Sequence, residues 1–295
     1  MFTAGCDRQV KMWDLGSNQF TQIGLHGAPV RCVRAVNHPT AGLLVASGSW
    51  DKTVKYWDTR SPNAIATVDV GERVYSMDAR HSLMVVGTAD RVNGNPPQRE
   101  RKIHLFDIIN SPQQVQKEEP SPLMFQTRAI AVFPNQTGYL VGSIEGRVAV
   151  QNFEGMVPNQ QSYTFKCHRR TMTKDHKPVT TTDKRASAQA GNYDEVHAVN
   201  VIKFHPSGTF VTGGADGVYI FWDKDAKARL TKPSEPCGHS ISAGAFSSSG
   251  QLFAYAVSDD WSQGHAHHDH TKATNTIYLH RMGEKECTPR SKSSK

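Results

Sequence analysis

Residues 51–58 read DKTVKYWD: an acidic residue is followed six positions later by tryptophan and then by aspartate. Between these ends the chain reads as a turn and then as a strand in which polar and apolar residues alternate. The same arrangement recurs at residues 7–14 and 216–223. A self-similar unit that repeats about every 40–45 residues is typical of the blades of a WD-repeat β-propeller. The sequence therefore predicts an all-β propeller.

Alternating residues and turn signals outline five such units and one leading fragment. We expect a propeller domain over residues 1–282, with a partial blade at 1–15 and blades at 26–60, 70–109, 124–154, 192–229 and 236–282. A polar insertion at 90–101 is expected to place Glu100 at the acidic position of its blade. The basic, aperiodic stretch 167–193 is predicted to be mobile, and the basic tail 283–295 to be disordered.

The repeated residues are expected to have a structural role. An aspartate in the turn can bond the backbone and a nearby His or Ser, while the bulky tryptophan fills the gap between adjacent blades. The residues expected to do this are Asp7, Trp13, Asp51, Trp57, Asp216 and Trp222. His26 and His239 occupy the position before a blade's first strand, and we interpret them as structural hydrogen-bonding residues.

Composition limits the class of protein. Hydrophobic residues make up 37% of the chain and charged residues 21%, which is typical of a globular protein. No apolar run approaches the ~20 residues that span a bilayer, and no signal peptide is recognisable. Five scattered cysteines predict reduced thiols in an intracellular protein. The net charge of +7 favours acidic or polyanionic partners.

Residues 265–270 read HAHHDH, the densest group of metal-ligating side chains. Imidazole and carboxylate groups can bind zinc or nickel, so His265, His267, His268 and His270 are weak metal candidates. Because no second ligand group is set by spacing, we predict a solvated loop with no metal or cofactor. Recognisable catalytic motifs are absent, so the chain is predicted not to be an enzyme. A propeller hydrolase or metal-dependent enzyme that uses this tract is the alternative of another class.

Two groups of basic residues lie beside aromatic residues. The first contains Trp222, Lys224, Lys227 and Arg229, and the second contains Phe165, Lys166 and Arg169, with Arg147 on the preceding strand. Basic side chains interleaved with aromatic faces suit phosphate contacts and base stacking. They equally suit an acidic peptide that lies across a propeller face. Ordinary solvated charges beside core aromatics are the third interpretation.

Several longer stretches resemble one family. They are FTAGCDRQVKMWDL (2–15), GSWDKTVKYWDTR (48–60), GSIEGRV (142–148), FKCHR (165–169), FWDKDA (221–226) and FAYAVSDDWSQG (253–264). Over nearly the whole chain they are similar to the poly(A)+ RNA export WD-repeat factors of the nuclear pore. A related family, the mitotic-checkpoint WD-repeat proteins, shares the same kind of partner peptide.

The resemblance implies a seven-bladed propeller without enzymatic activity, and it implies partners and a location. The family binds the acidic GLEBS segment of a phenylalanine-glycine nucleoporin and acts in mRNA export, in the nucleus, at the nuclear pore and envelope, with shuttling to the cytoplasm. A basic groove contacts single-stranded RNA, and the residues carried over to it are Arg147, Phe165, Lys166, Arg169, Trp222, Lys224, Lys227 and Arg229. The alternative is a spindle-checkpoint scaffold that binds acidic peptides of checkpoint kinases. No membrane insertion is implied.

The beginning of the chain departs from the family's pattern. The family has about one and a half further blades before the position that matches Phe2. We therefore expect an N-terminally truncated propeller with about five blades and a fragment. Open strand edges would make such a form poorly stable.

Overall fold

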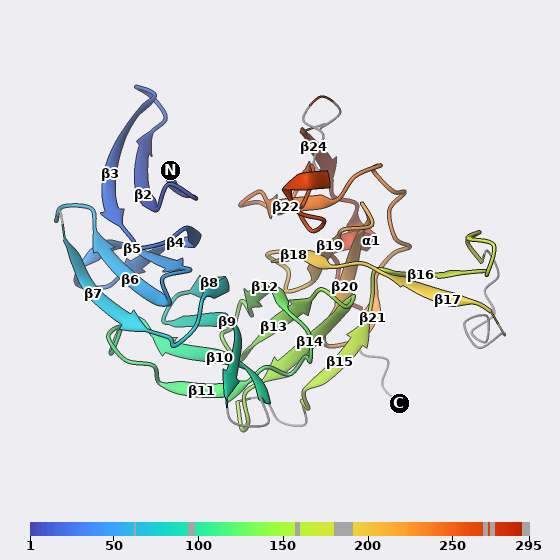
Figure 1. Cartoon of the computed structure of the whole chain (residues 1–295), viewed down its shortest axis with the longest axis horizontal. Helices are drawn as coiled ribbons and strands as arrows, with labels where there is room; N and C mark the ends of the chain where they lie inside the picture. The colour runs from blue at the N-terminus through green and yellow to red at the C-terminus, as the bar shows by residue number, and fades with distance from the viewer. Residues whose placement is uncertain are drawn as a thin grey trace. The chain divides into compact units, whose positions relative to one another are not determined.

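The computed structural model describes residues 1–61, 63–93, 98–156, 160–179, 191–267, 271 and 275–290. Within these residues the regular structure is almost entirely β-strand (Figure 1), apart from the 3-10 helix η2 (His265–His267) and the helix α1 (Glu284–Cys287). The chain forms two compact units. One consists of Met1–Val141 with Gln151–Gln161, and the other consists of Gly142–Val150 with Ser162–Lys295.

The strands pair with their neighbours in the sequence, and every described pair is antiparallel. The first sheet contains β1 (Phe2–Ala4), β2 (Gln9–Asp14) and β3 (Gln19–Leu25). The second contains β4 (Val30–His38), β5 (Gly42–Ser49), β6 (Thr53–Asp58) and β7 (Ala64–Asp69). The third contains β8 (Val74–Arg80), β9 (Leu83–Asn93), β10 (Gln98–Asp107) and β11 (Lys117–Pro120).

The remaining strands follow the same plan. The fourth sheet is ordered β12 (Thr127–Val132), β13 (Gly138–Ser143), β14 (Arg147–Asn152) and β15 (Tyr163–Lys166). A two-stranded ribbon, β16 (Arg169–Met172) with β17 (Tyr193–Val196), comes next. The fifth sheet contains β18 (Val199–Phe204), β19 (Phe210–Gly214), β20 (Tyr219–Asp223) and β21 (Ala228–Arg229). The sixth contains β22 (Ile241–Phe246), β23 (Leu252–Val257) and β24 (Thr276–Arg281).

The predicted all-β fold of WD repeats is confirmed, but the blade count is corrected. The described residues form six blade sheets, and the count of seven that the resemblance implied is not confirmed. Residues 1–15 are not a two-stranded fragment, because β3 adds a third strand to them. The sequence did not predict β3, because the first four residues of this strand are all exposed and its apolar residues do not alternate with polar ones.

The outer strands were also missed. The fourth strands β7, β11, β15 and β21 are short or lie largely at the surface, so packing does not impose a clear apolar pattern on them. The predicted insertion at 90–101 is instead an extension of the β9–β10 hairpin, in which Asp90 pairs with Arg101 and Arg91 with Glu100. Glu100 therefore lies in a strand and not in a blade turn, and its prediction was wrong.

Two stretches predicted to be irregular contain regular structure. Part of residues 167–193 forms β16, which pairs with β17 from Arg169 opposite Val196 to Met172 opposite Tyr193. The tail contains α1, and the backbone N–H of Arg290 donates to Asp223 Oδ2 at 2.8 Å. Residues 180–190 and 291–295 of these predictions lie outside the described residues.

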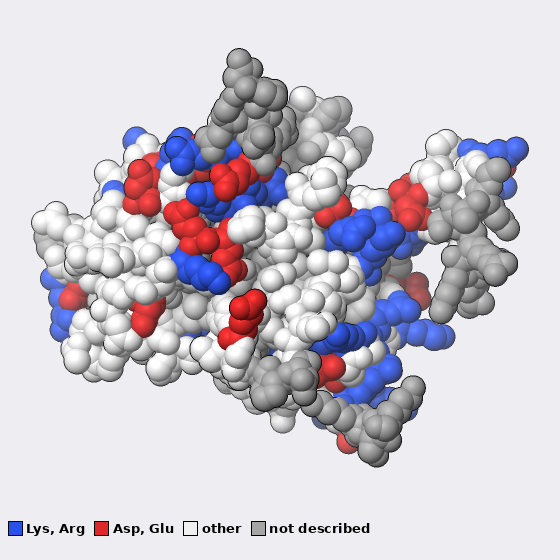
Figure 2. Space-filling view, turned by 90° about the horizontal axis from the view of Figure 1, so that it is seen from below, with Lys and Arg blue, Asp and Glu red and all other residues white. Residues whose placement is uncertain are grey.

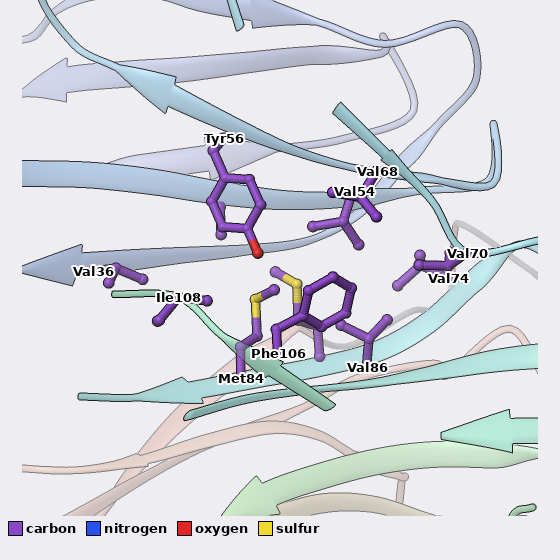
Figure 3. Packing of buried hydrophobic residues seen from close by; sticks show 12 residues of the cluster. Val36, Val54, Tyr56, Val68, Val70, Val74, Met84, Val86, Phe106 and Ile108 are labelled. Carbon is purple, nitrogen blue, oxygen red and sulfur yellow. The ribbon is translucent and has the colours of Figure 1, made fainter. Parts of the chain in front are cut away.

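A packed cluster of buried residues in the first unit lies between its second and third sheets (Figure 3). Tyr56, Met84 and Phe106 point toward one another there, surrounded by valines of both sheets. Tyr56 and Phe106 are each 1% exposed, and Met84 is fully buried. Burial of such side chains stabilises the folded state by about 1.5–3 kcal/mol each, so this cluster holds the two sheets together.

Candidate nucleic-acid interface

Each of two blades contains a chain of hydrogen bonds that joins an aspartate, a histidine, a hydroxyl group and a tryptophan. In the first unit His26 Nδ1 lies 2.8 Å from Asp51 Oδ2, and His26 Nε2 lies 2.7 Å from Ser47 Oγ. Trp57 Nε1 donates to the same Ser47 Oγ at 2.7 Å. His26 thus makes the structural hydrogen bonds predicted for it. We call these residues the His26 network.

The second unit repeats this arrangement around His168. His168 Nδ1 lies 2.9 Å from Asp216 Oδ1, and His168 Nε2 lies 2.9 Å from Thr212 Oγ1. Trp222 Nε1 donates to Thr212 Oγ1 at 2.9 Å, which completes the His168 network. A side chain at Gly214 would place its Cβ 2.3 Å from His168 Nδ1, so only glycine leaves room for the ring.

His168 lies in the stretch FKCHR (165–169), which contains the second basic group, and the sequence did not reveal its role in the network. The reason is that the ribbon β16–β17 is inserted between His168 and the first strand of its blade, β18. His26, by contrast, lies in the turn directly before β4. The signal that could have found His168 is the pair Asp216 and Trp222, because the matching pair Asp51 and Trp57 bonds the same chain of groups with a histidine that precedes its blade.

The carboxylates of both networks are held in the charged form. Burial opposes ionisation of Asp51, but hydrogen bonds from Thr53, Gly27 and His26 lower its pKa to about 2. Burial also opposes ionisation of Asp216, and there the hydrogen bond from His168 lowers the pKa. These aspartates and histidines are therefore committed to the fold, which argues against an acid–base role for them.

The first blade has an aspartate and a tryptophan in a simpler arrangement. Asp7 pairs with Lys11 at 2.7 Å and accepts a hydrogen bond from the backbone N–H of Gln9 at 3.2 Å. Trp13 Nε1 donates to Thr3 Oγ1 at 2.8 Å. No histidine contributes to these contacts among the residues described there.

The structure brings the two predicted aromatic residues together. The ring centroids of Phe165 and Trp222 are 4.6 Å apart. Trp222 is only 8% exposed and its indole N–H is bonded to Thr212, so it supports the site from beneath. Phe165 and its neighbour Tyr163 are half-buried and are the aromatic faces nearer to solvent.

The basic side chains of the 224–229 loop have different environments. Lys224, which was predicted to line the groove, is only 9% exposed, and its Nζ lies 2.7 Å from Asp225 Oδ1. Lys227 is exposed, and its Nζ lies 4.8 Å from the centroid of the Tyr163 ring. Arg229 is also exposed. Two of the three charges are therefore available to a ligand.

Arg147 and Arg169 are both engaged with the turn between β13 and β14. Arg147 Nε lies 3.3 Å from Glu145 Oε2, and Arg169 donates to the Glu145 carbonyl at 2.7 Å. Lys166 is exposed and lies directly opposite Arg147 in the β14–β15 ladder. Like charges in such positions repel each other, and an anion close to them would relieve this repulsion.

An open cavity of about 780 Å³ lies beside these residues, entirely within the second unit. Its basic lining residues are Lys166, Arg169, Arg170 and Arg229, and its acidic ones are Glu195, Asp216 and Glu235. Asp216 already accepts a hydrogen bond from His168. Figure 2 shows lysine and arginine side chains gathered over the right-hand part of this face, where Figure 1 places β15, β16 and β21. The basic surplus suits an anionic ligand.

Most of the histidine tract at residues 265–270 lies outside the described side chains. His265 is exposed in η2, while the side chain of His267 and all of His268 and His270 lie outside the described residues. Within the described part of the chain, no group of three or more His, Cys, Asp or Glu residues is placed to hold a metal ion. No described helix has the length and apolar character needed to cross a membrane.

Comparison with known proteins extends this description. The family described as WD domain, G-beta repeat matches residues 18–58 and 191–223. The chain is similar to Protein Rae1 of Drosophila melanogaster, with 43% identity over 277 residues that cover 92% of this chain and 71% of the relative. It is 41% identical to mRNA export factor GLE2 of Chaetomium thermophilum, over 98% of this chain and 72% of the relative. It is 40% identical to Poly(A)+ RNA export protein of Schizosaccharomyces pombe, over 98% of this chain and 73% of the relative.

Proposed function

The chain belongs to the family of poly(A)+ RNA export WD-repeat factors, and from this premise we propose that it is a non-enzymatic adaptor in mRNA export at the nuclear pore. In this proposal the protein binds single-stranded RNA through the basic cavity of its second unit. It also binds the acidic GLEBS segment of a nucleoporin. It works in the nucleus and at the nuclear envelope and shuttles to the cytoplasm.

The observation that carries the RNA proposal is that exposed lysine and arginine side chains lie beside half-buried aromatic rings, at the cavity and on the neighbouring residues of β15 and the 224–229 loop. Lys166, Lys227 and Arg229 can each neutralise a phosphate, while Phe165 and Tyr163 present ring faces on which bases can stack. Stacking of one base on an aromatic ring contributes about 1–3 kcal/mol and depends little on sequence. Sequence-tolerant binding is what a carrier of many different mRNAs requires.

The structure narrows the set of residues that we propose for direct contact. Trp222 and Lys224 are nearly buried, and Arg147 and Arg169 are engaged with the turn at Glu145. In this proposal these four residues support the surface from within. The residues that contact the RNA directly are Lys166, Lys227, Arg229 and Phe165.

The proposal is tested by reversing three charges at once. The variant Lys166→Glu, Lys227→Glu, Arg229→Glu should lose at least tenfold in affinity for a fluorescently labelled 15-nucleotide poly(A) strand, measured by anisotropy. For the unmodified chain the logarithm of the binding constant should fall with the logarithm of salt concentration, with a slope of about −2 for three neutralised phosphates. A flat salt titration, or normal binding by the variant, would refute the assignment.

A matched control distinguishes the effect of charge at the cavity from the effect of the net charge of the whole chain. Arg31, Arg60 and Arg80 are exposed basic residues of the first unit. Their triple replacement by glutamate changes the net charge by the same amount and should leave RNA affinity within about twofold of the unmodified chain. An equal loss in both variants would show that binding depends on net charge alone and not on this cavity.

The peptide part of the proposal needs its own experiment. A GLEBS peptide and an acidic checkpoint-kinase peptide of equal charge are compared by isothermal titration calorimetry. We expect the nucleoporin peptide to bind at least tenfold more tightly. Preference for the kinase peptide would favour a spindle-checkpoint scaffold instead.

A further inference from the structure

A second cavity, of about 330 Å³, lies in the first unit, far in the sequence from the RNA surface. It is formed where the turn after β7 meets the β9–β10 hairpin and β11. Its charged and titratable lining residues come from all of these elements: Asp69, Glu72, Arg91, Glu100, Lys102, His104 and Glu118.

His104 is the unusual member of this lining. Its side chain is 1% exposed, and neither ring nitrogen forms a hydrogen bond with any residue that the structure describes. Glu118 Oε1 lies 3.5 Å from Nδ1, on the strand that pairs with the strand of His104. A buried polar group without a partner destabilises the fold by about 1–3 kcal/mol. Such a group facing a cavity therefore indicates a ligand that completes its hydrogen bonds.

The protonation state of His104 limits what that ligand can be. Burial lowers the pKa of His104, although Glu118 opposes this effect. The ring is therefore neutral at physiological pH and has one N–H donor and one lone pair. Because the carboxylate of Glu118 is on the Nδ1 side, at 3.5 Å, it favours the N–H on Nδ1, which leaves Nε2 as an acceptor. A ligand with N–H donors would supply the missing hydrogen bond to Nε2.

The charge of the cavity is acidic, although the chain as a whole has a net charge of +7. Four carboxylates line it, against the two basic side chains of Arg91 and Lys102. Lys102 is already paired with Glu118 at 2.8 Å, and Glu72 is paired with Lys52 at 3.0 Å. Asp69 accepts only a backbone hydrogen bond, from Gly71 at 2.7 Å, among its described contacts. Arg91 lies directly opposite Glu100 in the β9–β10 ladder, so the acidic surplus is centred on Asp69 and favours a cation.

We propose that this cavity binds the guanidinium group of an arginine side chain from a partner protein. A planar guanidinium has five N–H donors, which can bond Nε2 of His104 and a carboxylate at the same time. A bare metal ion fits less well, because no described group of three His, Cys, Asp or Glu residues is placed to hold one. The volume exceeds that of a guanidinium, so the aliphatic part of the arginine also enters.

Two capped tripeptides test the proposal on the whole chain. Acetyl-Gly-Arg-Gly-amide is titrated against protein with 15N-labelled histidine, and acetyl-Gly-citrulline-Gly-amide, which has nearly the same shape but no charge, is the matched ligand. The His104 imidazole signals are assigned with the His104→Gln variant. The arginine peptide should shift them saturably, with a dissociation constant on the order of 1 mM, and citrulline should bind at least tenfold more weakly.

Surface variants test the same site without disturbing the core. Asp69 and Glu100 are exposed, so Asp69→Asn with Glu100→Gln should weaken binding of the arginine peptide at least tenfold. The control pair Asp14→Asn with Glu154→Gln, at exposed acids of the same unit outside the cavity, should bind normally. If no saturable shift occurs, the cavity holds only water and the proposal is wrong. Equal binding of citrulline, or no effect of the site variants, would also overturn it.

Discussion

The His26 and His168 networks are built from the same side-chain chemistry, yet their surroundings differ. Around His26 the network is closed: Trp57 is 3% exposed, and a Cβ at Gly24 would lie 2.6 Å from its ring. Around His168 the network is open on one side, since His168, Asp216 and Trp222 all line the cavity of about 780 Å³. The same hydrogen bonds thus lie in a sealed core in one blade and in the wall of an open cavity in another.

The residue two positions before each histidine explains part of this difference. In the first unit it is Gly24, which allows β3 to lie against Trp57. In the second unit it is Lys166, an exposed residue that lines the cavity together with Trp222. A side chain cannot fit at the spacing found around Gly24, so a lysine requires a wider gap. The ribbon β16–β17, which is inserted after His168, adds Arg170 and Glu195 to the lining of the same cavity.

The largest expected effect comes from removing each tryptophan. Trp57→Ala should lower the free energy of unfolding by about 3–5 kcal/mol, because it leaves a closed void in the core. For Trp222→Ala the loss in free energy of unfolding should be at least about 1 kcal/mol smaller than for Trp57→Ala, because water from the adjacent cavity can enter the space. Urea unfolding of both variants measures the difference. A larger loss of stability for Trp222→Ala than for Trp57→Ala would contradict the description of the His26 network as closed and the His168 network as open.

Removal of the shared hydroxyl should have the next largest effect. Ser47→Ala leaves Trp57 Nε1 and His26 Nε2 without their partner, and each stranded group costs roughly 1–3 kcal/mol. Thr212→Val strands Trp222 Nε1 and His168 Nε2, but water in the cavity can reach His168. We expect the loss of stability by urea unfolding to be smaller for Thr212→Val. Ser47→Thr, which keeps a hydroxyl, is the control.

Substitution of Gly24 or Lys166, the residues two positions before the histidines, should change stability moderately or little. Gly24→Ala forces a Cβ into the Trp57 ring and should destabilise the chain by about 1–3 kcal/mol, read from thermal unfolding. Lys166→Gly removes no buried contact, so its melting temperature should change little while RNA affinity falls. A stable Gly24→Ala variant would contradict the close packing proposed for the His26 network.

The smallest expected effect is a dependence of stability on pH. Burial lowers the pKa of His26 below its ordinary value of 6.5, with Asp51 opposing part of the shift. The unfolded chain therefore binds more protons than the folded one just below pH 6.5, so stability should fall as pH drops through this region. The pKa of Asp51, at about 2, adds a further loss only as pH falls from 3.8 toward 2.

Melting temperatures from pH 7.5 to 5 test this dependence. His26→Asn should flatten the curve below pH 6.5, at a lower overall stability. His81→Asn is the control, since His81 is exposed and has a positive φ of 51° that asparagine accepts. A curve that is unchanged in His26→Asn would remove His26 as the source of the dependence.

Much of the fold was predictable because its signals are local. Trp57 and Asp51 lie on one hairpin, β6 alternates polar and apolar residues, and β5 is a short buried run that ends at a turn. The outer strands were not predictable, because β15 and β21 owe their existence to pairing with β14 and β20 and not to an apolar pattern of their own. Glu100 was misassigned for a related reason: hairpin length depends on register, which residue types specify only weakly.

The candidate site was predicted in composition but not in arrangement. The spacing of the residues could not show that Lys224 is nearly buried beside Asp225, since its neighbours along the chain are polar. Nor could it show that His168 bonds Asp216, because β16, β17 and two blade strands separate them in the sequence. Phe165 and Trp222 were named separately, and only the fold brings their rings to 4.6 Å.

The sequence by itself determined the type of repeat, the family and the residue types available for binding, because turn chemistry, strand alternation and motifs act over a few neighbouring residues. Tertiary structure decided which charges reach solvent, which histidine completes which blade, and where cavities open. These outcomes depend on burial and on contacts between distant segments. The unpartnered ring of His104 belongs to this second class, since its sequence neighbours are ordinary strand residues and only packing of β7, β9, β10 and β11 buries it.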